Sequence, residues 1–177
     1  MVLMLDSVGQ RAVEGMYLML NRPDAPFRLE KEMDSLSIVP LAVNTFPITI
    51  ANDEGEAYVA ACSWHDHFTD GEQAGGCVMG LLSPYYRIVE QLDGDQVVWT
   101  HIERYQAEGW VQIGAGVGPH EYWLKSGVMI PRTGKRQIHQ QAVILPPWWA
   151  ERFPGVVLEE NGFPPGSVMG TRIEKDD

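Results

Sequence analysis

Alternating apolar residues between positions 46 and 64 constrain the fold of this chain more than any other feature. Phe46, Ile48 and Ile50 recur at every second position, and a second alternation follows along the chain (Tyr58, Ala60, Cys62, Trp64). The residues between them, Asn-Asp-Glu-Gly at 52–55, are typical of a turn. A period of two places one face of a strand against a core. The pattern therefore predicts a β-hairpin over residues 46–64.

Residues 7–20 carry the pattern of a helix instead. Ser7 followed by Gln10 forms a capping box, and the apolar residues recur every four positions (Val8, Ala12, Met16, Leu20). A break with two prolines follows at 21–26. A second helix is predicted over 28–39, with Leu29, Met33 and Leu36 on one face.

The remaining segments predict a mixture of elements in a single domain spanning residues 1–177. Several glycines between 68 and 80 indicate a loop. We further expect a short helix over 83–92, a second hairpin with strands at 97–105 and 110–113, a short helix over 119–125 and a strand at 137–145. Two helices followed by strands and mixed elements indicate the α+β class, around a mainly antiparallel sheet.

The acidic side chains are concentrated in one part of the chain. There are 13 Lys and Arg against 24 Asp and Glu, a net charge of −11. No Lys or Arg lies between Lys31 and Arg87, but carboxylates accumulate there: Glu32, Asp34, Asp53, Glu54, Glu56, Asp66, Asp70 and Glu72. Such a surface repels phosphate backbones, so we expect no direct binding of nucleic acid. It suits either a solvated acidic surface or contact with a basic protein partner.

Two further features bear on location. No apolar run reaches the ~18 residues that a membrane span requires, so we expect no membrane association. Cys62 and Cys77 are too few for a disulfide framework and lack CxxC spacing. They predict reduced, buried thiols in a cytoplasmic protein.

Residues 17–64 also carry a resemblance to a known family. A helix containing Tyr17-Leu18-Met19-Leu20 and a segment ending Ile38-Val39-Pro40-Leu41-Ala42 precede the strand at 46–50 and the run Gly55 to Cys62-Ser63-Trp64. This order resembles the toxin-activating lysine acyltransferases, which are similar in fold to the GNAT-type acyltransferases. The pair Gly94-Asp95 before Trp99 extends the resemblance to roughly residues 7–105. It implies a GNAT-like, mainly antiparallel central sheet with two N-terminal helices. It also implies acyl or acetyl transfer from acyl-CoA or an acyl carrier protein to an amine or hydroxyl.

The catalytic residues of that family do not map directly onto this chain. The family's histidine follows a Ser-Pro pair, and the equivalent residues here, 25–28, contain no histidine. The family's aspartate corresponds to His101 when counted from Gly94-Asp95, and to Ile102 when counted from Trp99. Either the chemistry is rewired, or the fold is kept without it. The second alternative predicts a non-catalytic acidic protein that binds or inhibits a basic or nucleic-acid-handling partner.

For an acyltransferase, the best candidate base is His101. Histidine titrates near neutrality, and Glu103 two residues on shares its strand face, where it can orient the imidazole. The donor's phosphate groups require backbone N–H groups, which a glycine-rich loop before a helix supplies. We therefore expect donor binding at Gln112, Gly114, Gly116 and Gly118. The plainer alternatives are a half-buried strand histidine and a hairpin end followed by a flexible loop.

The run His65-Asp66-His67, followed by Asp70 and Glu72, resembles a set of metal ligands. Two histidines at alternate strand positions point to one side, as a metal site requires. The two early helices are foreign to the β-barrels that use this pattern. We therefore expect polar residues after a strand and no metal.

Overall fold

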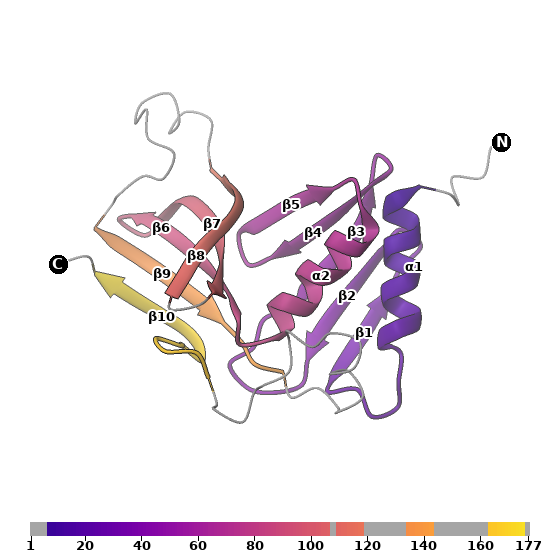
Figure 1. Ribbon diagram of the computed structural model, residues 1–177, viewed down its shortest axis with the longest axis horizontal. Coiled ribbons are helices and arrows are strands. Elements are labelled where there is room, and N and C mark those ends of the chain that lie inside the picture. Colours follow the sequence, from indigo (N-terminus) through magenta and orange to yellow (C-terminus); the bar gives the residue numbers. More distant parts are fainter. Residues whose placement is uncertain (1–6, 107–108, 119–133, 144–162, 176–177) are drawn as a thin grey trace.

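The computed structural model describes residues 7–106, 109–118, 134–143 and 163–175, which form two helices and two antiparallel sheets (Figure 1). Sheet A is a meander in the order β1-β2-β3-β4-β5. Its strands are β1 (Phe27–Lys31), β2 (Ser35–Pro40), β3 (Ile48–Asp53), β4 (Glu56–Ala61) and β5 (Trp64–Phe68). Sheet B has the order β10-β9-β6-β7-β8. Its strands are β6 (Tyr86–Asp93), β7 (Gln96–Gln106), β8 (Gly109–Val117), β9 (Lys135–Gln140) and β10 (Gly170–Lys175).

The expected α+β fold with a GNAT-like central sheet is wrong, because the structure is mostly β and divides its strands between two sheets. The segment expected as the second helix, 28–39, forms the antiparallel pair β1–β2. Met33, which the helical pattern placed on the apolar face, is a turn residue with 80% of its surface exposed. Leu36 and Ile38 are fully buried instead, on one face of β2. The period of two prevails here over the helical spacing.

Two further predictions, for residues 68–80 and 83–92, were wrong. Most of the segment 68–80, expected as a loop, belongs to the helix α2 (Gly71–Leu82), and the Asp70 carboxylate caps this helix by accepting from the Glu72 N–H at 2.9 Å. One of the glycines, Gly80, allows a close approach, since a Cβ atom there would lie 2.5 Å from the Tyr86 ring. The helix expected over 83–92 is β6, which is buried on both faces between β7 and β9.

The first helix and both predicted hairpins are confirmed. Helix α1 (Val8–Leu20) begins after Ser7, whose hydroxyl accepts from the Gln10 N–H at 3.1 Å. The Gln10 side-chain amide donates to the Met33 carbonyl in the β1–β2 turn at 3.2 Å. Pairs β3–β4 and β7–β8 form as expected, and the strand expected at 137–145 is β9. The helix expected over 119–125 lies outside the described residues.

The buried face of β4 differs from the prediction. Ala57, Val59 and Ala61 are buried, whereas Tyr58 lies on the opposite, partly exposed face. Cys62 is not in a strand: it is exposed, in the turn after β4, with a positive φ of 53°. Apolar residues occupy both faces of this strand, so alternation alone did not identify the buried one.

Both helices cover one face of sheet A (Figure 1). The main core lies between this face and the two helices. Apolar residues of α1 and α2 pack there against alternate residues of β2, β3 and β4. Ile88 of β6 and Ile102 of β7 belong to the same core, which therefore continues onto the inner face of sheet B. No helix among the described residues is both long and apolar enough to cross a membrane.

Candidate functional site

The structure brings His101 and Glu103 into contact, as predicted. Both lie on the face of β7 opposite Ile102, with the His101 Nε2 atom 3.1 Å from Glu103 Oε1. Arg87 on the adjacent strand donates to the other Glu103 oxygen, and its guanidinium lies 4.2 Å from the centroid of the Trp110 ring. Burial tends to raise the pKa of Glu103, but the hydrogen bond from His101 and the charge of Arg87 outweigh it, and the pKa is lowered.

This geometry fits a buried ionic network better than a reactive base. His101 is 3% exposed and Arg87 is 7% exposed, so the network is largely shielded from solvent. Glu103 accepts from two neighbours at once, which stabilises its charged form and fixes β6 against β7. The catalytic role of His101 and Glu103 stays a prediction.

The glycines expected to form a loop belong to a strand as far as Val117. The pairing of β7 with β8 is irregular between Thr100 and Ile102. Gly114 lies in this irregularity with a φ of 68°, a conformation that favours glycine. At Gly116 a Cβ atom would lie 2.2 Å from the Trp99 ring. These glycines thus have structural roles, and donor binding at Gln112, Gly114, Gly116 and Gly118 stays a prediction.

A second polar network joins the two sheets. The Ser63 hydroxyl, in the β4–β5 turn, donates to Glu90 Oε1. The Thr100 hydroxyl lies 2.7 Å from the Ser63 hydroxyl. The other Glu90 oxygen lies 2.9 Å from His139 Nε2, and His139 Nδ1 lies 2.9 Å from the Thr171 hydroxyl. Burial tends to raise the pKa of Glu90, but the hydrogen bonds of His139 and Ser63 outweigh it and lower the pKa.

The order of these groups is unlike that of a catalytic triad. In a triad the imidazole lies between the serine and the carboxylate, so that it can accept the serine proton. Here the Glu90 carboxylate lies between Ser63 and His139, and its lowered pKa makes it a weak base. Cys62 beside it is a poor candidate for a nucleophile, because desolvation of its sulfur and then the Glu90 charge raise the thiol pKa to about 12, although the residue is exposed. We interpret this network as a structural connection between the sheets.

Seven exposed carboxylates lie at one end of sheet A, and we call this surface the acidic end. They come from the β1–β2 turn, the β3–β4 turn and the start of α2 (Glu32, Asp34, Asp53, Glu54, Glu56, Asp70, Glu72). The antiparallel register brings these segments together, because β2 begins where β3 ends and β4 begins (Figure 1). The Asp34 carbonyl accepts from the Asn52 N–H at 2.8 Å, which joins the two turns directly. Asp66, the remaining acidic residue of this part of the sequence, lies within β5 and outside the acidic end.

Helix α1 packs directly on the β3–β4 turn. The Gly9 N–H donates to the Gly55 carbonyl at 3.0 Å, and the Ser7 hydroxyl donates to Asn52 Oδ1 at 2.9 Å. A Cβ atom on Gly9 would lie 2.2 Å from the Glu56 carbonyl oxygen, so only glycine fits without a shift. This contact fixes the position of the turn and of its carboxylates.

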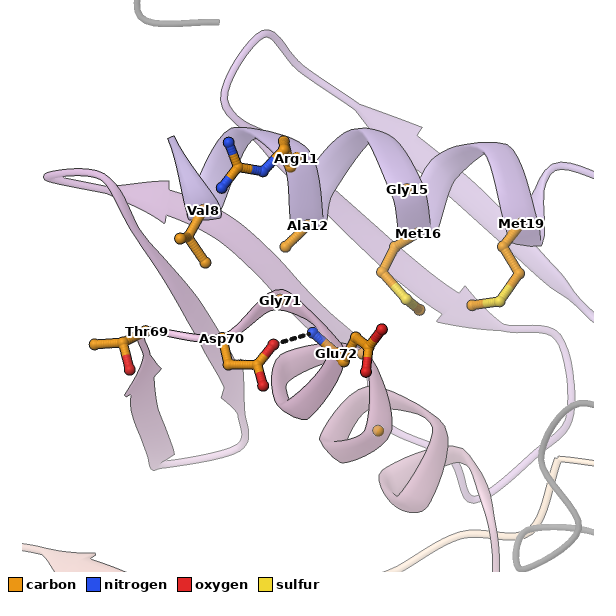
Figure 2. Close-up of a pocket in the computed structure, with 12 residues that line it drawn as sticks. Val8, Arg11, Ala12, Gly15, Met16, Met19, Thr69, Asp70, Gly71 and Glu72 are labelled. Carbon is orange, nitrogen blue, oxygen red and sulfur yellow. Dashed lines mark hydrogen bonds between the residues drawn. The ribbon is translucent and has the colours of Figure 1, made fainter. Parts of the chain in front are cut away.

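A groove of about 790 Å³ runs between α1 and α2 and adjoins the acidic end. Figure 2 shows Ala12, Met16 and Met19 pointing from α1 toward α2. Asp70 and Glu72 line the groove and belong to the acidic end as well. Arg11 of α1 lines the same groove (Figure 2), so the charged margin holds one cation beside the two carboxylates. The groove therefore combines an apolar wall, with adaptable methionine side chains, and a charged margin.

The expected pair His65 and His67 does lie on one face of β5, beside the Tyr58 ring. His67 Nδ1 is 3.7 Å from Asp53 and 3.8 Å from Glu56, so its imidazole adjoins the acidic end. Within the described ranges, no group of three or more His, Cys, Asp or Glu side chains is placed to hold a metal ion.

Sequence reasoning missed Glu90 and His139. The prediction of a helix over residues 83–92 was the reason, because Glu90 in fact lies in a strand that is buried on both faces. The run Arg87-Ile88-Val89-Glu90-Gln91-Leu92 contains adjacent β-branched residues, which favour a strand and were the available signal. No protein-family model, curated protein or solved structure matches this chain. Its function has to be argued from its own residues.

Proposed function

We propose that this chain is a non-catalytic binding protein whose acidic end holds a basic protein partner. The observation that carries the proposal is the convergence of seven exposed carboxylates from three separate segments on one end of sheet A. A concentrated negative surface attracts a positively charged partner and increases its rate of association. The same charge disfavours nucleic acid as the direct ligand.

Two basic side chains of sheet A pair with carboxylates outside the acidic end. Lys31 forms an ion pair with Glu14 at 2.8 Å, and Arg28 forms one with Glu30 at 2.7 Å. Neither of these carboxylates belongs to the acidic end. These two ion pairs therefore leave the carboxylates of the acidic end unneutralised, and the His67 imidazole is the basic group that lies beside two of them, Asp53 and Glu56.

Backbone strain at Glu54 supports the same proposal. Asp53 pairs with Glu56, so Glu54 and Gly55 form a two-residue turn, and both have positive φ values, 49° and 100°. Such turns favour Asn, Asp or Gly at the first of these positions. Glu is unfavourable there and places an additional carboxylate at the tip of the turn. The turn requires this conformation but does not require a glutamate in it, and strained residues are concentrated at functional surfaces.

The adjacent groove gives the partner an apolar surface to bury. Exposed ion pairs contribute little affinity by themselves, about 0.2–1 kcal/mol each, so stable binding requires a desolvated contact. Val8 and Met19, which are partly exposed, offer one beside Asp70 and Glu72. The partner surface thus combines basic residues with at least one apolar side chain. We place this interaction in the cytoplasm, because Cys62 and Cys77 are free thiols.

A salt-dependent pull-down from lysate of the source cells, with matched charge variants, tests the proposal. The test variant combines Asp53→Asn, Glu54→Gln and Glu56→Gln, and the control makes the same change of charge at exposed sites elsewhere: Asp24→Asn, Asp93→Asn and Asp95→Asn. The captured protein is then purified, and its affinity for each variant is measured. We expect the test variant to bind about tenfold more weakly than the control, because three carboxylates at about 0.5 kcal/mol each sum to that factor.

Two results would contradict the proposal. Equal loss of binding in the two variants would mean that only net charge matters, and unchanged binding by the test variant would exclude the acidic end as the binding surface.

A further inference from the structure

Each sheet has two edge strands, and two of these four edges face outward. The edges β5 and β8 adjoin each other between the sheets, because Asp66 Oδ2 lies 3.6 Å from the position of a Cβ atom on Gly114. The edges β1 and β10 lie on the outer sides of the molecule instead (Figure 1). Within the described ranges, no strand pairs with the outer side of either one. The backbone N–H and C=O groups of such an edge can bond to a further strand.

The two outer edge strands carry the same order of residue types. β1 contains Arg28-Leu29-Glu30-Lys31, and β10 contains Arg172-Ile173-Glu174-Lys175. Their apolar residues differ in environment. Leu29 is half-buried and packs against the main core, whereas Ile173 is 54% exposed. Of the two strands, β10 is therefore the one that still has apolar surface to bury at its centre.

Strand β10 lacks several of the features that normally block a free edge. Proline, a β-bulge, or cover by a helix or loop protects many edge strands. β10 contains no proline, and it pairs with β9 without a register shift from Gly170 to Lys175. Arg172 on one face of the strand is exposed, and so are Thr171 and Ile173 on the other. Exposure on both faces leaves room for a neighbouring strand.

Charged side chains also protect edges, but the charges of β10 are complementary to those of a second copy. A two-fold axis perpendicular to the sheet pairs two antiparallel strands about one central residue. Centred on Ile173, the axis places Arg172 of each copy opposite Glu174 of the other, and the two Ile173 side chains opposite each other. Centring on Arg172 or on Glu174 instead places two like charges opposite each other. Opposite-charge and apolar cross-strand pairs stabilise a sheet, and like charges destabilise it.

We propose that the chain forms a two-fold dimer through β10, which joins two copies of sheet B into one continuous sheet. Backbone hydrogen bonds between the strands supply affinity, and the pairs of Arg172 with Glu174 set the register. Within one chain, Glu174 forms ion pairs with Arg136 of β9 at 2.6 Å and with Arg172 at 2.8 Å. In the dimer Arg172 pairs with the second copy, so each Glu174 keeps two cationic neighbours.

The dimer is weak and depends on concentration, because one pair of short strands buries little surface. It is independent of the proposed basic partner, since β10 belongs to sheet B and the acidic end belongs to sheet A. Loss of partner binding therefore leaves the dimer unaffected, and loss of the dimer leaves partner binding unaffected.

An exchange of charges between two variants tests the proposal, with sedimentation velocity from micromolar to millimolar protein as the assay. Arg172→Glu places carboxylates on both sides of the dimer contact, and Glu174→Arg places guanidinium groups on both sides. We expect each variant alone to dimerise about tenfold more weakly than the wild-type chain, which corresponds to about 1.4 kcal/mol, because two Arg–Glu pairs become like-charged pairs. An equimolar mixture of the two variants should dimerise as the wild-type chain does, because opposite charges then meet at both positions.

The matched controls are Arg28→Glu and Glu30→Arg, which make the same changes of charge on β1. Each should dimerise as strongly as the wild-type chain. Hydrogen exchange of the wild-type chain reports on the contact without any variant: the backbone N–H groups of β10 should exchange more slowly at millimolar than at micromolar concentration.

Four results would each overturn the proposal. They are a wild-type chain that stays monomeric at millimolar concentration, a mixture that dimerises no better than its two components, loss of the dimer in the β1 variants, and exchange from β10 that does not slow with concentration.

Discussion

The clearest stability prediction concerns Glu54. Its φ of 49° lies in the left-handed region, which costs an ordinary L residue roughly 1–2 kcal/mol, whereas asparagine tolerates it well. Glu54→Asn therefore removes strain without changing the turn. We expect the free energy of unfolding to rise by about 1 kcal/mol. For a chain of this length such a change raises Tm by about 2–4 °C.

Charge and strain must be separated in this experiment, because Glu54→Asn also removes a carboxylate from the acidic end. Glu54→Gln is the matched control: it removes the same charge but keeps the long side chain in the strained conformation. Unfolding in urea at neutral pH measures all three proteins. We expect Glu54→Asn to be clearly more stable than Glu54→Gln.

Equal stabilisation by the two variants would show that relief of repulsion, and not of strain, is the cause. No stabilisation by Glu54→Asn would refute the reasoning from φ. Both variants should weaken binding of the basic partner to a similar degree, because each removes the same charge. A gain in stability together with a loss of binding is what a strained functional residue predicts.

Three further predictions follow from individual contacts. Gly9→Ala should lower the free energy of unfolding by about 1–3 kcal/mol, because the added Cβ atom meets a backbone oxygen. Gly15→Ala on the same helix should raise it by about 0.5–1 kcal/mol, because the added Cβ atom meets nothing within 4 Å. Unfolding in urea measures both variants. Glu103 has a lowered pKa, so its contribution is present above the ordinary carboxyl value of 4.5 and is lost as the pH falls through its folded pKa. Glu103→Gln should lower the free energy of unfolding by about 3 kcal/mol at neutral pH, because Arg87 is left buried without its charged partner. The stability of this variant should also fall less steeply in acid than that of the wild-type chain. Unfolding curves at several pH values measure both effects. Cys62, with a pKa of about 12, should react slowly with a thiol reagent at neutral pH despite its exposure, and a rate equal to that of the unfolded chain would contradict this.

The parts of the fold that could be predicted are those in which local pattern and tertiary environment agree. Helix α1 has a capping serine and a single apolar stripe, and the pairs β3–β4 and β7–β8 have short turns between alternating strands. Residues 28–39 fit two periods equally well. The correct choice depends on pairing with β3, and a helical pattern in one segment carries no information about that neighbour.

The candidate site was predictable in composition but not in arrangement. The acidic residues are visible as a run without Lys or Arg, yet their convergence depends on the register of β2, β3 and β4. Asp66 shows the limit of that reasoning. In the sequence it belongs to the same acidic run, but its place on the edge strand β5 directs it to a cavity between the sheets.

The acidic end also concentrates several features that oppose stability, and their coincidence is an argument for function. Seven exposed carboxylates repel one another there, and the turn between Asp53 and Glu56 holds Glu54 in a strained conformation. The N-termini of α1 and α2 lie at the same end and carry partial positive charge, which offsets part of this repulsion. A fold under selection for stability alone would place Asn or Gly at position 54 and would disperse its carboxylates. The helix N-termini reduce the repulsion between the carboxylates in the free protein, and a basic partner would neutralise the remaining negative charge.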